Sequence, residues 1–106
     1  MKQTIFNYEM DNKNWEIKMT THAYERMKER FEDLDEFEVA GDIIALGKNK
    51  LREHIKNKDD IAIIDKDKGL SIIASFDESY KNWIKIITLI DKSDIYIKEG
   101  TTLEEL

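Results

Sequence analysis

The spacing of hydrophobic residues changes twice along this chain, and this limits the folds that the chain can adopt. In residues 15–19 apolar and charged residues alternate, which is the pattern of a strand with one buried face. From residue 22 to residue 33 the apolar residues recur at helical spacing. Beyond residue 60 short apolar runs rich in isoleucine favour strands. These patterns predict an α+β fold.

Seven elements are predicted, in the order β-β-α-α-β-β-β. They are strands at 4–10 and 15–19, helices at 22–33 and 36–46, and strands at 61–64, 70–76 and 83–90. Two N-terminal helices are expected to pack on one face of a curved antiparallel sheet, and residues 95–97 are a candidate edge strand. Residues 1–100 then form a single domain. Residues 101–106 are a short acidic tail that either forms a capped helical turn or frays.

Local signals mark the ends of the predicted helices. Thr20 and Thr21 are candidate N-caps of the first helix, because a threonine hydroxyl can accept from the free amides of a first turn. Asp35 is the expected N-cap of the second helix. Gly47 is expected to break or kink that helix, since glycine adopts the left-handed conformation that ends helices. The alternative is a helix that continues on the same face through residues 48–55.

Composition excludes several kinds of site. The chain has no cysteine, and its two histidines lie far apart, at positions 22 and 54. A disulfide framework, a thiolate zinc site and a cysteine nucleophile are therefore excluded, and no metal or cofactor is expected. No apolar run approaches the roughly 18 residues of a membrane helix, and no signal peptide opens the chain. The expected compartment is the cytoplasm.

The charge balance is acidic, with 17 Lys and Arg against 23 Asp and Glu, and a net charge of −6. A broadly basic nucleic-acid binder is disfavoured. A local basic patch, or an acidic surface that binds a basic protein, stays open. Only three of the cations are arginines, Arg26, Arg30 and Arg52, so their positions are informative. Carboxylates at predicted turns, such as Asp65 and Asp67, are interpreted as solubilising.

The first predicted helix carries the most informative side chains. His22 and Arg26 are four positions apart and are therefore neighbours on the helix surface, and Arg30 lies at the border with the apolar face. His22 also stands at the helix start, where free amides and the helix dipole favour an anion. An imidazole, a guanidinium and free N–H groups in one place can hold a phosphate, and the imidazole can exchange a proton near neutral pH.

This helix resembles the opening helix of small phage- and plasmid-borne domains that read His-Ala-x-x-Arg-Met-x-x-Arg. The resemblance is carried by His22, Ala23, Arg26, Met27 and Arg30, at matching spacing. Those domains are grouped with the barnase–EndoU–colicin–RelE nuclease-like fold. The resemblance implies a leading strand, two helices and a curved antiparallel sheet, as in ribonuclease toxins.

The same resemblance implies an activity, which is metal-independent cleavage of RNA by attack of the 2′-hydroxyl on the adjacent phosphate. His22 would be the general acid or base, and Arg26 and Arg30 would hold the phosphate and stabilise its extra charge. Thr88 matches a hydroxyl residue that the family often carries on a late strand. These four residues are the candidate catalytic residues, and they are expected to converge in one concave site.

Two other interpretations of this helix stay open. One is a solvated face on which Glu25, Glu29 or Glu32 pairs with Arg26. In this interpretation Arg30 pairs with an acidic group on the second helix, for which Glu36 and Glu38 are candidates. The other is a non-catalytic acidic phage or adaptor protein that binds and inhibits a basic host protein surface, with electrostatic steering of the encounter. The expected partner is RNA for an enzyme and a host protein otherwise. No membrane partner is expected, and exposed sheet edges leave a dimer open.

The other aromatic and histidine residues are assigned structural roles. The four tyrosines are scattered along the sequence, which predicts no stacking platform for RNA. Trp15 and Trp83 are expected in the core or at its edge. His54 is expected on a solvated helix or loop.

Overall fold

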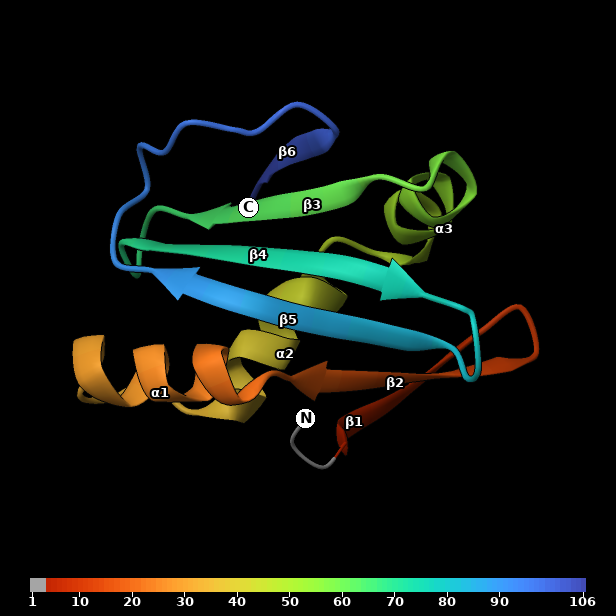
Figure 1. The fold of residues 1–106 in the computed structure, drawn as a ribbon, viewed down its shortest axis with the longest axis horizontal. Helices are drawn as coiled ribbons and strands as arrows, with labels where there is room; N and C mark the ends of the chain where they lie inside the picture. The colour runs from red at the N-terminus through yellow and green to blue at the C-terminus, as the bar shows by residue number, and fades with distance from the viewer. Residues whose placement is uncertain (1–3) are drawn as a thin grey trace.

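The computed structural model describes residues 4–106, which contain a six-stranded mixed sheet and three helices (Figure 1). The helices are α1 (Thr21–Arg30), α2 (Glu36–Ala45) and α3 (Lys48–Asn57). The strands are β1 (Thr4–Met10), β2 (Lys13–Met19), β3 (Asp60–Asp65), β4 (Leu70–Asp77), β5 (Trp83–Ile90) and β6 (Thr101–Glu105). Across the sheet the strand order is β1-β2-β5-β4-β3-β6.

The predicted N-terminal hairpin is present as β1 and β2. Met10 pairs with Lys13 across the turn, and the turn residues Asp11 and Asn12 have φ of 53° and 63°. Positive φ at both central positions is the geometry whose twist matches that of two hairpin strands. Asp and Asn tolerate this conformation better than most residues, so the local sequence explains the turn.

The predicted order β-β-α-α-β-β-β and the all-antiparallel sheet are wrong. The described residues contain a third helix and a sixth strand, and β2 runs parallel to β5 as β3 runs parallel to β6. Ile17 of β2 lies opposite Ile84 of β5, so the hairpin is inserted beside a strand that is distant in sequence. An alternating pattern marks a strand whichever way its neighbours run, and it therefore carries no information on direction.

The predicted break at Gly47 is confirmed, and it produces the third helix. α2 ends at Ala45, Gly47 has φ of 90°, and α3 begins at Lys48. Side chains with a Cβ rarely adopt this φ, so glycine suits the corner between the two helices. The alternative of one continuous helix is wrong, although Leu51 of α3 is as completely buried as Ile43 of α2.

Both predicted helix caps on the N-terminal side are confirmed. The Thr20 hydroxyl accepts from the Ala23 amide at 3.1 Å, and the Asp35 carboxylate accepts from the Glu38 amide at 2.9 Å. α1 is shorter than the predicted helix at 22–33, because Phe31 leaves it in an extended conformation with φ of −132°.

The C-terminal segment differs from its prediction. Residues 95–97 form no strand, whereas Thr101–Glu105 form β6 in place of a helical turn or a frayed tail. β6 pairs with β3, with Leu103 opposite Ala62, and the Leu106 amide donates to the Ile64 carbonyl at 3.0 Å. The edge of β3 offers unpaired backbone groups, and a short acidic segment satisfies them despite its weak strand pattern.

The core lies between the sheet and the helices. α2 and α3 lie behind the sheet in Figure 1, while α1 continues from β2 and lies along β5. Fully buried side chains come from β2, β3, β4, β5 and from all three helices, among them Ile17, Met19, Ala23, Ile43, Leu51, Ile63, Ile72, Ile84 and Ile86. The other face of the sheet has no helix over it. None of the described helices is long and apolar enough to span a membrane.

Candidate functional site

The strand β5 carries a β-bulge in its second half. Ala74 of β4 pairs with Ile86, whereas Ile73 pairs with Thr88, so Ile87 is an extra residue in β5. The extra residue shifts the alternation of side chains by one place. As a result Thr88 is half-buried on the helix-free face of the sheet, where the regular alternation would have directed it into the core.

The bulge is also where α1 is attached to the sheet. The Thr20 amide donates to the Ile86 carbonyl at 3.0 Å, and the Thr20 hydroxyl donates to the Ile87 carbonyl at 2.9 Å. His22 follows Thr20 by two positions, and Thr88 directly follows Ile87. These two hydrogen bonds therefore bring the start of α1, with His22, to the part of β5 that carries Thr88.

The three candidate residues of α1 lie in a row along the helix. His22 and Arg30 are exposed and Arg26 is half-exposed. They are spaced four residues apart, about 6 Å along the helix axis, so the row extends for about 12 Å from His22 to Arg30. We call these three residues the His/Arg row. The structure spreads them along α1 instead of gathering them at one point, and only His22 stands at the end nearest Thr88.

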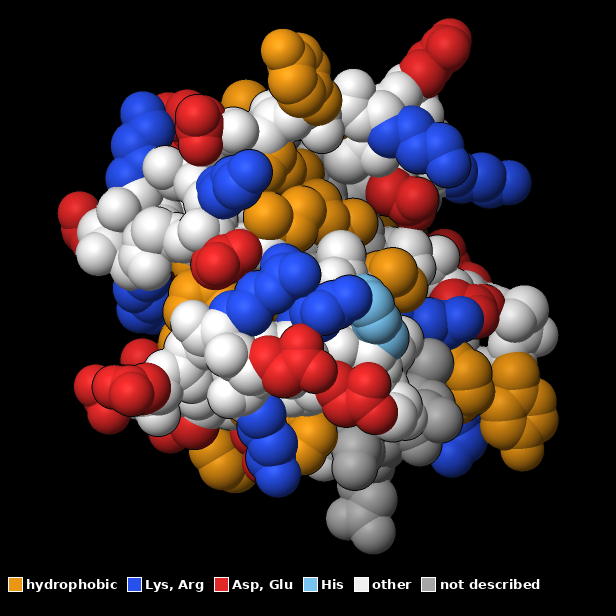
Figure 2. Space-filling view, turned by 60° about the vertical axis from the view of Figure 1, so that its left-hand side comes forward, with side chains coloured by type: hydrophobic (Ala, Val, Ile, Leu, Met, Phe, Trp, Pro, Cys, Tyr) orange, Lys and Arg blue, Asp and Glu red, His pale blue; other side chains and the backbone are white. Residues whose placement is uncertain are grey.

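Both arginines of the row have carboxylate partners at the surface. Arg26 pairs with Glu29 at 3.0 Å, and Arg30 pairs with Asp91 at 3.5 Å. All four side chains are at least one-third exposed, between 34% and 58%. Exposed pairs of this kind contribute only about 0–1 kcal/mol, so an anionic ligand can displace either carboxylate. Figure 2 shows this end of the molecule, where basic side chains stand among acidic ones.

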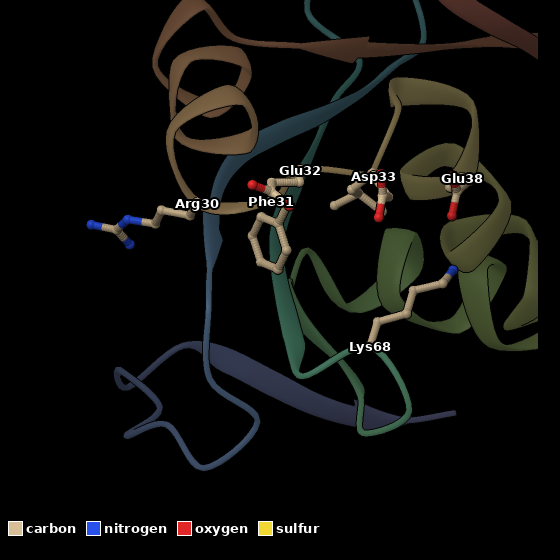
Figure 3. Close-up of a pocket in the computed structure, with 7 residues that line it drawn as sticks. Arg30, Phe31, Glu32, Asp33, Glu38 and Lys68 are labelled. Carbon is tan, nitrogen blue, oxygen red and sulfur yellow. The ribbon is translucent and has the colours of Figure 1, made fainter.

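A cavity of about 380 Å³ lies beyond the C-terminal end of the row. Its lining consists of Arg30, Phe31, Glu32, Asp33, Leu34, Glu38 and Lys68. In Figure 3 Arg30 points away from the other lining residues, while Lys68 reaches from the β3–β4 turn toward α2. More carboxylates than cations therefore face the cavity. For this reason the cavity is a poor site for a phosphate, in contrast to the His/Arg row.

Sequence reasoning missed a buried charged cluster beside this cavity. Lys68 Nζ lies 3.1 Å from Asp42 Oδ1 and 3.4 Å from Asp65 Oδ2. Burial and the neighbouring Asp65 carboxylate together raise the pKa of Asp42 to about 6, against the opposing effect of Lys68. Asp42 Oδ2 is buried and has no hydrogen-bond partner among the described residues, which disfavours the ionised form of this carboxyl.

A signal for this cluster was present in the sequence. Asp42 directly precedes Ile43, and it lies next to the apolar face of the predicted helix, where a carboxylate is unusual. Asp65 was interpreted as a solubilising turn residue, but it is buried at the end of β3. Burial of both depends on how α2 lies against the β3–β4 turn, which no local pattern reveals.

His54 is also buried, contrary to its predicted place on a solvated helix or loop. Its Nε2 lies 3.2 Å from Glu104 Oε1, and Lys50 Nζ lies 3.0 Å from Glu104 Oε2. The Thr102 hydroxyl donates to Asp59 at 3.1 Å. These contacts join β6 to α3 and to the residue before β3, so His54 has a structural role. Among residues 4–106 no group of three or more potential ligands is placed to hold a metal ion.

Comparison of the chain with protein-family models, with curated proteins and with solved structures found no match.

Proposed function

We propose that this protein is a metal-independent endoribonuclease of the toxin or phage type, acting in the cytoplasm, with the start of α1 as its reaction centre. The observation that supports this proposal is the attachment of Thr20, two positions before His22, to the carbonyl of Ile87, the residue directly before Thr88 in the β5 bulge. Bulges often occur next to active sites because they redirect a single side chain. The resemblance of α1 to the nuclease-like helix agrees with this placement.

The proposed chemistry needs one proton acceptor and a set of phosphate ligands. His22 takes the proton of the RNA 2′-hydroxyl, the 2′-oxygen bonds to phosphorus, and the bond from phosphorus to the 5′-oxygen breaks. Solvent water supplies the proton for the departing 5′-oxygen. Arg26, one turn away, stabilises the extra negative charge of the transition state, and the Thr88 hydroxyl donates to a phosphate oxygen.

Arg30 has a positioning role in this proposal. It lies two turns from His22, so it reaches a neighbouring phosphate of the same strand and not the one that reacts. Before RNA binds, Arg26 pairs with Glu29 and Arg30 pairs with Asp91. When the RNA strand binds, charge-assisted hydrogen bonds to phosphate replace these exposed ion pairs.

The first test is cleavage of mixed RNA in EDTA by the parent protein and by His22→Ala. We expect the variant to lose about 100- to 10,000-fold in rate, the usual contribution of a general base. Its melting temperature is expected to stay unchanged because His22 is exposed. Arg26→Ala is expected to lose cleavage as well. Arg52→Ala is the matched control, since Arg52 pairs with Asp11 at 2.8 Å, outside the row. Cleavage that survives His22→Ala would refute the proposal.

A second candidate function is a non-catalytic acidic protein that inhibits a basic host protein surface. It is favoured by the net charge of −6 and by the carboxylates that already pair with Arg26 and Arg30. Intact RNA after incubation with the parent protein, together with a salt-sensitive complex with a basic protein, would support this function instead.

A further inference from the structure

Two aromatic rings and three lysines gather on the helix-free face of the sheet. Trp83, at the start of β5, contacts the ring of Tyr80 edge-on, with 6.4 Å between the ring centroids. Lys18 Nζ lies 4.9 Å and Lys85 Nζ 5.8 Å from the centroid of the Trp83 ring, and Lys81 Nζ lies 6.0 Å from that of Tyr80. We call these five residues the aromatic–lysine cluster.

The cluster holds lysines close together, although their mutual repulsion does not stabilise the fold. Lys18 of β2 lies directly opposite Lys85 of β5 in the parallel register, and like charges at such a position destabilise a sheet. Lys85 is compensated by Asp77, at 2.7 Å. Among the described residues neither Lys18 nor Lys81 lies within ion-pair distance of a carboxylate, although both attract the Glu16 carboxylate from farther away, so both ammonium groups can bind a further anion.

The two rings differ in their availability. The Trp83 indole is half-buried, and its Nε1 donates to Glu16 Oε2 at 3.1 Å, while the Thr4 hydroxyl donates to the other oxygen of Glu16 at 2.6 Å. These bonds fix the orientation of the indole. Tyr80 is 81% exposed, so its ring face is open to a ligand and is backed by Trp83.

We propose that the aromatic–lysine cluster binds single-stranded RNA, with one base stacked on Tyr80 and the phosphates on either side bound by Lys18 and Lys81. Exposed rings among cations are the chemistry that recognises unpaired bases and their backbone. The tyrosines are scattered in sequence, which predicts no stacking platform, but the structure places Tyr80 beside Trp83, and the proposal rests on this pair. The choice of RNA rests on the proposed function.

The location of the cluster agrees with a substrate-binding role. Trp83 and Thr88 lie on the same strand, and at about 3.3 Å per residue the steps between them span about 16 Å. A strand bound at Tyr80 can therefore follow β5 to the start of α1 within a few nucleotides. The cluster would hold RNA a short distance from His22 without contacting the reacting atoms.

The test is fluorescence anisotropy with a labelled single-stranded RNA of twelve nucleotides, using full-length protein that carries His22→Ala so that the probe stays intact. Adding Tyr80→Ala is expected to weaken binding by about five- to 100-fold, the range for loss of one stacking ring. Tyr80→Phe is expected to retain the affinity. Tyr96→Ala is the matched control, because Tyr96 is a fully exposed tyrosine outside the cluster. Lys18→Gln and Lys81→Gln should each lower the number of counterions released on binding by about one. This number is obtained from the slope of log affinity against log salt concentration.

Two results would overturn the proposal. One is an equal affinity of the Tyr80→Ala and Tyr96→Ala proteins for the probe. The other is binding of a double-stranded RNA as tightly as the single strand, since bases within a duplex cannot stack on Tyr80.

The outcomes also separate this proposal from the proposed function. RNA binding that depends on Tyr80, without cleavage by the parent protein, refutes the nuclease alone. His22-dependent cleavage with no effect of Tyr80→Ala refutes the cluster alone.

Discussion

At the scale of single residues, exposure to solvent and neighbouring charges distinguish the side chains of this protein. His22 is exposed near a β-bulge, whereas Asp42 is buried with a second carboxylate and one lysine. The residues that sequence reasoning placed correctly are those with local partners, such as the caps Thr20 and Asp35, whose bonds reach three positions along the chain. Asp42 has partners 23 and 26 positions away, so its burial could not be predicted locally.

Asp42 gives a pH-dependent prediction at this scale. Its pKa is raised to about 6 in the folded protein, so the folded state binds more protons than the unfolded state between its usual pKa of 3.8 and about 6. The contribution of Asp42 to stability therefore falls as pH rises through this interval. Asp42→Asn, which mimics the protonated carboxyl, is expected to gain about 1–2 kcal/mol relative to the parent between pH 5 and pH 7.5.

Urea unfolding of the parent protein and of Asp42→Asn at both pH values measures this gain. Asp67→Asn is the control, because Asp67 is an exposed carboxylate of the β3–β4 turn, next to Lys68. A stability difference between Asp42→Asn and the parent that is the same at pH 5 and pH 7.5 would contradict the prediction.

At the scale of elements, β6 differs most from what its sequence suggests. It has five residues, only two of which are half-buried hydroxyl side chains at its start, and it is held by backbone bonds to β3 and by the charged groups of α3. By contrast, the break between α2 and α3 was predictable, because a glycine at positive φ acts within its own segment.

Glu104 tests the attachment of β6. Burial alone would raise the pKa of Glu104, but hydrogen bonds from Lys50 and His54 lower it. The charge of Glu104 therefore stabilises the fold above its usual pKa, and this contribution is lost as pH falls through the lowered value. Glu104→Gln is expected to cost about 1–2 kcal/mol at pH 7 and to converge with the parent in acid.

Chemical denaturation at pH 7 and at pH 3 measures both effects. Glu105→Gln is the matched control on the same strand, since Glu105 makes only an exposed pair with Lys66 at 3.6 Å and is expected to change stability by less than about 0.5 kcal/mol. Equal losses in the two variants would show that the contacts of Glu104 with α3 do not hold β6.

At the scale of the whole molecule, the sheet depends on strands that are far apart in the chain. β5 lies between β2 and β4, so Ile84 is opposite Ile17 on one side and Phe76 on the other, and it is completely buried. The hairpin of β1 and β2 therefore has no sheet to join until β5 has formed. This arrangement makes the N-terminal and C-terminal halves a single cooperative unit.

Ile84→Ala is accordingly expected to destabilise the entire fold by about 2–4 kcal/mol, because it removes packing where three strands meet. Unfolding followed by far-ultraviolet circular dichroism and by the fluorescence of buried Trp15 should still coincide. Ile97→Ala, at a residue that is 37% exposed, should cost less than about 1 kcal/mol. Separate transitions for the two probes would show that the hairpin unfolds independently.

The sequence alone determined the features that depend on neighbouring residues. Hydrophobic spacing located five of the strands, capping residues located the starts of α1 and α2, and Gly47 located the break between α2 and α3, because these signals act within a few positions. It also identified the His/Arg row, since residues four apart share a helix face. Tertiary structure alone decided the direction and order of the strands, the addition of β6, the burial of Asp42 and the contact of Lys18 with Trp83. Each of these depends on contacts between distant positions, and a local pattern is compatible with more than one set of such contacts.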